Sequence, residues 1–322
     1  MRPAILVLLS VTLSLSLQYA HAQDEAFPRK PLRIVVPYAA GGSATLVTRL
    51  IGNKLSENIG QSVIIDNRGG GNGKIGAEAV SKANPDGYTL LFGETGMMAI
   101  NVWLMDRAGS HPVKDFVALG QVVTLDNALV AHPSAGVKNL RELVAKAASG
   151  PLIYGSSGTG TVGHLAMELL KTTLNVQVTH VPYKGGGPAV TDLLGGQIPM
   201  LVVTVPTAAP HILSGRLIGL ASLSAARTPI LPNVPTVEEQ GFPAFSLVQW
   251  YGYFAPAGTP RRLVDYLNTQ IRKATEHPEV AKALIASGNN VAITSADVFA
   301  KTVRDDVERW GKVIRDAHIQ AN

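Results

Sequence analysis

The sequence predicts an α/β protein with two lobes, each a mainly parallel sheet flanked by helices. Short apolar strands recur along the 322 residues, and each ends in a loop rich in glycine, serine or threonine. A segment with helical spacing of apolar residues follows each loop. This alternation is typical of right-handed crossovers between parallel strands. The apolar content of 46% allows a sizeable core, and the length suits about two domains.

The strands and helices follow one another in a regular order. The predicted strands with their loops read LRIVVPYAAGGS, SVIIDNRGGGNGK, YTLLFGETGM, PLIYGSSGTGTV, VTHVPYKGGGPA, MLVVTVPTAAP and LIGLASLS. After the first loop, apolar residues between Leu46 and Leu55 share one face of a helix that ends near Gly60. Similar apolar faces occur in NLRELVAKAA, VGHLAMELLKTTL, RRLVDYLNTQIRKAT and VFAKTVRDDVERWGKVI.

Two long apolar stretches with few turn residues, 120–134 and 245–260, are predicted to cross between the lobes. Two crossings make the first lobe discontinuous, with residues 28–125 plus 250–322 in one body. Residues 126–249 then form the second lobe.

The N-terminus resembles a secretory signal peptide. Arg2 precedes an apolar run over residues 4–17, and residues 20–22 read Ala-His-Ala, a small-x-small cleavage site. The run is shorter than the roughly 20 residues that span a bilayer. We therefore expect residues 1–22 to be removed after Ala22, which leaves a periplasmic protein that is not embedded in the membrane.

Composition excludes several chemistries. The chain has no cysteine, so it has no disulfide framework, thiolate nucleophile or cysteine-ligated metal. The formal net charge is +5 and the basic residues are scattered. This pattern favours small anionic ligands and argues against nucleic acid.

The loop AAGGS at residues 39–43 presents a helix N-terminus with almost no side chains. Backbone N–H groups at such a terminus bind anions. Ligands of open α/β sheets lie beyond the carboxyl ends of the strands. If both lobes direct these ends into a shared cleft, AAGGS faces the loop SSGTGT of residues 156–161 and an anion is held from both sides. No cofactor is required.

Catalytic and nucleotide-binding motifs are weak. Residues 71–76 and 158–163 both match G-x-G-x-x-G, but glycine is abundant and an exported chain meets little NAD. We interpret the first match as a structural loop and the second as an anion-binding loop. The P-loop fails at Ile75, and the nucleophile elbow fails at Thr159. His164 and Glu168 have metal-ligand spacing without a third ligand, so neither a metal nor an enzyme is predicted.

The sequence resembles one family closely: the Bug or TctC-like receptors of tripartite tricarboxylate transporters. The resemblance begins near Phe27 and runs to the C-terminus. Its motifs are FPRKPLRIVVPYAAGG, LSENIGQSVIIDNRGGGNGKIGAEAVSKANPDGYTLLFG, YGSSGTGTVGHLAMELLK, HVPYKGGGPAVTDLLGGQI, HILSGRLIGLA, LPNVPTVEEQGFPAF, Trp250 and APAGTPRRLVDYLN. Their order and spacing are specific to the family.

The resemblance implies a two-lobed periplasmic binding protein of the type II-like class. Such a receptor closes on a small carboxylate-bearing solute like a Venus flytrap and delivers it to membrane permease subunits, without catalysis. We expect a monomer. Two alternatives stay open: a sensing subunit that signals to a membrane kinase, and an exported serine-type hydrolase. A hydrolase needs a base oriented by a third group, and the sequence offers none.

The resemblance also assigns the ligand-binding residues. They lie in the first loop, in its counterpart in the other lobe, and in two further loops that complete the walls. The predicted residues are Tyr38, Ala40, Gly41, Gly42, Ser43, Thr45, Glu94, Thr95, Gly96, Met97, Ser156, Ser157, Thr159, Gly160, Thr204, Pro206 and Thr207.

Two positions depart from the family pattern. Thr45 and Pro199 stand where the family often has aspartate. The missing charges argue against an ammonium-bearing ligand. With methionines at positions 97, 98 and 200, they favour a less polar acid, aromatic or aliphatic.

Overall fold

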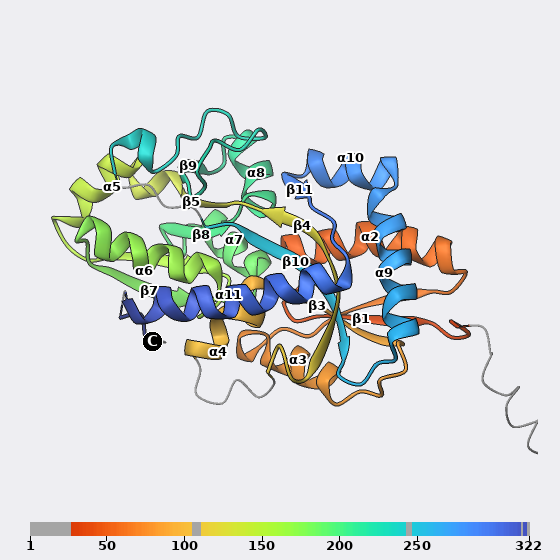
Figure 1. Cartoon of the computed structure of the whole chain (residues 1–322). Coiled ribbons are helices and arrows are strands. Elements are labelled where there is room, and N and C mark those ends of the chain that lie inside the picture. Colours follow the sequence, from red (N-terminus) through yellow and green to blue (C-terminus); the bar gives the residue numbers. More distant parts are fainter. Residues whose placement is uncertain (1–26, 105–110, 243–246, 317, 321–322) are drawn as a thin grey trace, which may run out of the picture.

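The computed structural model describes residues 27–104, 111–242, 247–316 and 318–320. These residues form two sheets, each covered by helices (Figure 1). The predicted α/β class is confirmed. The predicted signal peptide, residues 1–22, lies outside the described residues. In the described part of the chain, no helix combines the length and the apolar character that a membrane crossing needs.

The first sheet has six strands, and its parallel part is β2-β1-β3. In spatial order the strands are β11 (Asn289–Val291), β4 (Phe116–Leu125), β10 (Gln249–Pro256), β3 (Thr89–Glu94), β1 (Leu32–Val36) and β2 (Val63–Asn67). The helices of this half are α2 (Ser43–Ile59), η2 (Gly71–Gly73), α3 (Lys74–Ser81), the π-helix η3 (Gly96–Ile100), α4 (Asn101–Leu104), α9 (Arg261–Glu276), α10 (Pro278–Ala286) and α11 (Ala296–Asp316).

The second sheet has five strands, and its parallel part is β7-β6-β8. In spatial order they are β7 (Val178–Pro182), β6 (Leu152–Ser156), β8 (Met200–Thr204), β5 (Asn127–Ala131) and β9 (Ile218–Ser222). Its helices are η4 (Pro133–Ala135), α5 (Leu140–Ala147), α6 (Val162–Leu174), α7 (Gly186–Leu194), α8 (Val205–Leu213) and η5 (Glu238–Gln240).

Both sheets are mixed, where the sequence predicted mainly parallel ones, and the path of the chain explains the antiparallel pairs. Strands β1, β3, β6 and β8 run toward the space between the sheets. Strands β5 and β10 enter a sheet from that space, so each runs against its neighbours. Only Asp126 separates β4 from β5, which places the first passage between the sheets there. The predicted lobe limits at residues 125 and 250 stay a prediction.

Local sequence signals account for the helix that opens the site. In α2, Val47, Ile51 and Leu55 are buried on one face and join the core of the first sheet. The helix starts after Gly42, whose backbone is extended, and ends at Gly60 with φ +65°. Glycine adopts this left-handed conformation without the steric cost of a Cβ. The first loop therefore leads directly into a helix N-terminus, as the sequence predicted.

Helix α11 contacts both halves of the molecule (Figure 1). Near its start, Phe299 and Val303 pack in the core beside β10. Near its end, Trp310 and Ile314 join the core of the second sheet. The predicted limits thus assign to the first lobe a helix whose last turns belong to the core of the second.

Candidate functional site

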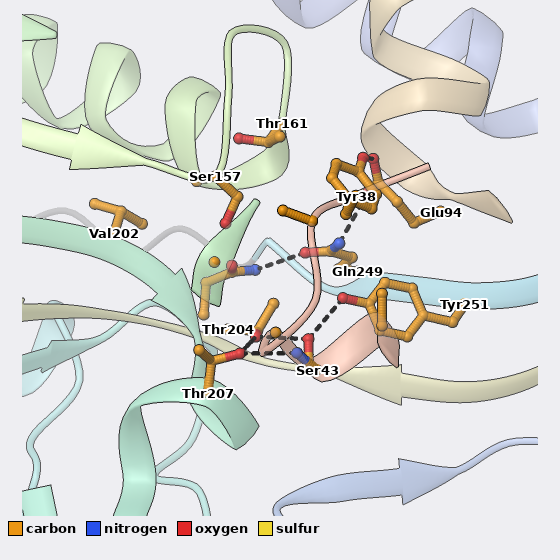
Figure 2. Close-up of a pocket in the computed structure, with 16 residues that line it drawn as sticks. Tyr38, Ser43, Glu94, Ser157, Thr161, Val202, Thr204, Thr207, Gln249 and Tyr251 are labelled. Atoms are coloured by element: carbon orange, nitrogen blue, oxygen red, sulfur yellow. Dashed lines mark hydrogen bonds between the residues drawn. The ribbon is translucent and has the colours of Figure 1, made fainter. Parts of the chain in front are cut away.

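A pocket lies between the two sheets, where β1, β3, β6 and β8 end (Figure 2). Loops and helix N-termini that follow these strands face one another there, as expected for an open α/β sheet. The space between the atoms of the pocket, its opening to solvent included, is about 450 Å³. Its lining residues are Tyr38, Ala39, Gly42, Ser43, Ala44, Glu94, Asn127, Ser157, Thr161, Gly163, Gly186, Val202, Thr204, Thr207, Gln249 and Tyr251.

Four helices begin at this pocket. Ser43 opens α2, Gly186 opens α7, Thr161 is the N-cap of α6 and Thr204 is the N-cap of α8. The first N–H groups of a helix have no partner within it, and the helix dipole places partial positive charge at the same end. Four such ends around one pocket favour a bound anion. Among the described lining residues there is no lysine, arginine or histidine, so neutral donors would hold that anion.

Ser43 joins the two sides of the pocket. Its N–H donates to Thr207 Oγ1 at 3.1 Å, and its Oγ lies 2.9 Å from Thr204 Oγ1. The same Oγ lies 2.7 Å from the Tyr251 hydroxyl (Figure 2). One serine thus contacts the second half of the molecule through α8 and its own half through β10.

Glu94 forms the centre of another wall of the pocket. It is 2% exposed and accepts hydrogen bonds from the Tyr38 hydroxyl, the N–H groups of Gly96 and Met97, and Gln249 Nε2. Burial raises the pKa of Glu94, and these four hydrogen bonds act in the opposite direction. Burial and the nearby Glu94 charge raise the pKa of Tyr38 well above its ordinary value, so the phenol remains a donor.

Two contacts join the halves of the molecule. The first contact is between loop 39–43 in the first half and residues 184–187 with α8 in the second. The Ala39 N–H donates to the Lys184 carbonyl at 2.9 Å. A Cβ on Gly187 would overlap the Ala40 carbonyl oxygen and lie 3.0 Å from the Cα of Gly41. The two backbones therefore touch without a side chain between them, and this contact borders the pocket through Gly42 and Gly186.

The second contact between the halves joins Gly96 and Asn101 to loop 158–161. A Cβ on Gly96 would lie 2.8 Å from the Gly160 carbonyl oxygen and 2.9 Å from the Thr161 Cα. A Cβ on Gly160 would overlap the Asn101 amide oxygen. Neither Gly96 nor Gly160 lines the pocket. These glycines therefore let the two halves approach each other closely, and they do not themselves line the cavity.

Behind loop 156–161, two histidines stack with their ring centroids 4.4 Å apart: His164 and His180. His180 Nε2 lies 2.7 Å from Ser156 Oγ, which also donates to the Gly158 carbonyl at 3.0 Å. The Gly160 N–H donates to His164 Nδ1 at 3.2 Å. The hydroxyl of Ser156 thus shapes the loop from behind and does not line the pocket.

The structure separates the predicted binding residues into two groups. The lining group is Tyr38, Gly42, Ser43, Glu94, Ser157, Thr204 and Thr207. The group outside the lining is Ala40, Gly41, Thr45, Thr95, Gly96, Met97, Ser156, Thr159, Gly160 and Pro206. In this second group, Thr45 Oγ1 accepts from Asn67 Nδ2 and Thr95 Oγ1 accepts from the Trp250 N–H. Ligand contact by any of these residues stays a prediction.

Sequence reasoning missed part of the lining. Three of the missed residues lie at or near the starts of strands: Gln249, Tyr251 and Asn127. A prediction that considers only the carboxyl ends of strands does not include them. Gly186 lies in the motif VPYKGGGPA, which carried the family resemblance but no assigned role. Thr161 had a usable signal, because a threonine before an apolar helical run is a typical N-cap.

His164 and Glu168, the pair with metal-ligand spacing, have other partners. Glu168 accepts from Lys171 Nζ at 3.1 Å, and His164 faces Gly160 and His180. Within the described residues, no group of three histidine, cysteine, aspartate or glutamate side chains has the arrangement of a metal site.

Comparison with known proteins connects this geometry to a family. The model of the tripartite tricarboxylate transporter family receptor matches residues 47–319. A UPF0065 protein from the tcbD-tcbE intergenic region of Pseudomonas sp. is 38% identical, over 98% of this chain and 95% of that protein. Protein BugT of Bordetella pertussis is 33% identical, over 92% of each chain.

Solved structures share the fold at similar identity. An adipate-bound R. palustris protein has a TM-score of 0.88 at 34% identity, over 92% of this chain and 99% of the other. MatC from Rhodopseudomonas palustris with bound malate has a TM-score of 0.85 at 32% identity, over 89% of this chain and 100% of the other.

Proposed function

Because the chain belongs to the tripartite tricarboxylate transporter receptor family, we propose that it captures a small organic acid between its lobes and delivers it to a membrane transporter of that class. Family membership and the two-lobed binding-protein fold, both predicted from the sequence, are confirmed. The family and its solved members are solute-binding receptors, so the expectation of a receptor and not an enzyme is confirmed as well.

One observation carries the choice of an acid as ligand. Four helix N-termini open on a pocket whose described lining residues include no cationic side chain. A carboxylate matches this arrangement because it accepts several N–H and O–H bonds and its charge interacts favourably with each helix end. The solved relatives hold adipate and malate, which supports the same ligand class here.

The expected affinity follows from ordinary magnitudes. A hydrogen bond to a charged group contributes about 1.5–3 kcal/mol, and a helix end contributes about 0.3–2 kcal/mol. Three or four such contacts, less the cost of ordering the cleft, approach the roughly 8 kcal/mol of a micromolar complex. No buried cation is needed.

Closure follows from the position of the pocket. Donors come from both halves: Ser43 from the first, Ser157, Thr161 and Thr207 from the second. A ligand that contacts both halves binds the closed form more tightly than the open form, and only such a difference shifts the population. The closed, acid-bound form is then what the transporter would recognise. A periplasmic location agrees with the family; signal-peptide cleavage after Ala22 and a monomeric state are part of the proposal.

The test begins with the protein as purified from the periplasm. Native mass spectrometry under gentle conditions should show the mature chain with an added mass of an organic acid. Isothermal titration of that acid should give micromolar or tighter binding, and its methyl ester should bind at least tenfold more weakly. Equal binding of acid and ester, or product formed on incubation, would contradict the proposal.

Delivery needs its own measurement. Labelled acid should enter proteoliposomes that hold the cognate permease only when the receptor is present. Binding of the acid without any receptor-dependent uptake would leave the binding function intact and would reject delivery, for example in favour of a sensing role.

A further inference from the structure

One wall of the pocket is built around a single buried carboxylate, Glu94. Oε1 accepts from the Tyr38 hydroxyl and from the Met97 N–H at 2.8 Å, and Oε2 accepts from the Gly96 N–H at 2.6 Å and from Gln249 Nε2 at 2.9 Å. All four partners are donors. The two backbone N–H groups and the Gln249 amide nitrogen can only donate, and with the Tyr38 hydroxyl as donor an ionised carboxylate accepts all four bonds.

This carboxylate carries a charge that no described lining residue neutralises. Its four donors are uncharged, and no lysine, arginine or histidine stands among the described residues of the pocket wall. The hydrogen bonds favour the ionised form against burial, which has the larger effect and raises the pKa of Glu94. Ionised Glu94 leaves a net negative charge beside the cavity. Gln249 Oε1 in turn lies 3.5 Å from Asn127 Nδ2, so the neutral amides of this wall are already engaged with one another.

The pocket is therefore electrically asymmetric. Helix N-termini at Ser43, Gly186 and Thr204 favour negative charge, and the wall with Glu94, which lies beside the fourth N-terminus at Thr161, disfavours it. Beside Glu94 stand two aromatic rings, Tyr38 and Tyr251, which offer a flat apolar surface (Figure 2). A ligand with one carboxylate has one favourable orientation, with that group at the helix ends and its body against the rings.

We propose that Glu94 determines specificity: it rejects acids that carry a second negative charge and selects monocarboxylates whose other end is uncharged. The inference rests on the proposed function, since it assumes that an acid occupies this pocket. Two like charges about 6 Å apart at an effective dielectric constant of about 20 change a binding constant by roughly 100-fold. This penalty falls on the second carboxylate of a diacid, whichever end enters first.

A second hollow offers the main alternative for a distal charge. It shares Tyr38 and Ser157 with the pocket and is otherwise lined by residues that include Lys184 and Asn72. A long diacid that passed between Tyr38 and Ser157 would bring its second carboxylate to the side of Lys184. That binding mode predicts a preference for the diacid over the monocarboxylate. The same titration therefore distinguishes it from rejection of the diacid by Glu94.

The experiment compares ligands that differ in one charge and hardly in shape. The wild-type protein, freed of bound ligand, is titrated with adipate and adipic monoamide, and with succinate and succinamic acid. We expect the monoamide to bind at least tenfold more tightly in the pair that fits the pocket. A diacid that binds as tightly as its monoamide, or more tightly, overturns the inference. A diacid preference that disappears in Lys184→Gln assigns the distal charge to the second hollow and overturns it as well.

A variant then locates the effect. In Glu94→Gln the preference for the monoamide should fall at least tenfold, because the opposing charge is gone. Glu308→Gln is the control: Glu308 is exposed on α11 and its loss changes net charge equally, so the preference should not move. An unchanged preference in folded Glu94→Gln overturns the inference. If Glu94→Gln does not fold, the wild-type comparison still decides.

Failure of the proposed function gives a different result. In that case none of the acids or monoamides binds to wild type, whereas failure of the specificity inference leaves acid binding present with the wrong order of affinities.

Discussion

The two contacts between the halves of the molecule differ in their position relative to the pocket. The first, between loop 39–43 and residues 184–187 with α8, borders the cavity and includes hydrogen bonds from Ala39 and Ser43. The second, between Gly96 and loop 158–161, meets the lining only at Thr161 and depends on close packing of backbone. Glycines in both regions looked alike in the sequence. From this difference we expect that a glycine near a ligand site can act on affinity by permitting closure, without touching the ligand.

The largest effect is expected from Gly187→Ala, which obstructs the first contact. The new methyl group would overlap the Ala40 carbonyl in the closed form, so closure requires a backbone shift. We expect at least a 100-fold loss of acid affinity by calorimetry. The open protein should unfold at the same or a higher temperature, because alanine favours a helix over glycine by up to about 1 kcal/mol.

Gly195→Ala is the matched control at the other end of α7. Its Cβ would meet only ordinary van der Waals neighbours, the nearest at 3.5 Å, so affinity should stay within about twofold. Wild-type affinity in Gly187→Ala would show that the first contact does not form in the ligand-bound state.

Gly96→Ala should have a smaller effect, since it obstructs the second contact less severely. The methyl group would lie 2.7 Å from Glu94 Oε1, 2.8 Å from the Gly160 carbonyl oxygen and 2.9 Å from the Thr161 Cα. A shift of a few tenths of an ångström in the Glu94 side chain and in loop 158–161 relieves part of the overlap. We expect a loss of about tenfold to thirtyfold in calorimetric affinity, near the cost of 1–3 kcal/mol for overpacking a tight site. A loss larger than that of Gly187→Ala would reverse the ranking of the two contacts.

Ser43→Ala should weaken binding about tenfold, because it removes one hydroxyl from the first contact while the backbone approach remains. Thr204 Oγ1 and the Tyr251 hydroxyl lose a partner, which costs about 1–3 kcal/mol when the group stays buried. Ser56→Ala, near the far end of α2, removes a hydroxyl that bonds only to the Gln61 carbonyl and should leave affinity unchanged. Equal losses in both variants would mean that α2 stability, and not the contact, is responsible.

The substitution with the smallest expected effect at neutral pH is His164→Gln, in the histidine pair behind loop 156–161, and its effect is on stability. Burial lowers the pKa of His164 to about 4 from an ordinary 6.5. The unfolded chain therefore takes up a proton first as pH falls, so the free energy of unfolding decreases from about pH 6.5 down to about pH 4. Thermal unfolding of the wild type should show this decrease. His164→Gln should make it shallower, and His180, whose pKa burial also lowers to about 4, should retain its own share. An identical pH profile in the variant would contradict the assignment.

Much of the fold was predictable because it depends on local patterns. The alternation of apolar strands with glycine-rich loops located β1, β3, β6 and β8, and the bare loop 39–43 correctly predicted the start of α2. The mixed character of the sheets was not predictable from local patterns, because it depends on which strands enter from the space between the sheets. Which side chain of a loop faces the cavity was also beyond the sequence: Ser157 lines the pocket, while its neighbour Ser156 turns to His180.

Gln249 shows a further limit. Its partners Glu94 and Asn127 are more than a hundred residues away in the chain, and the pairing of β10 with both β3 and β4 brings them together. No local pattern in residues 245–260 marks such a side chain as part of a binding wall.

The most direct test of the account is a crystal structure of the protein with its co-purified acid. We predict the carboxylate within hydrogen-bond distance of N–H or O–H donors from both halves, at the starts of α2 and of α6 or α8. An acid bound with its carboxylate on one half alone, or outside the space between the sheets, would contradict the account.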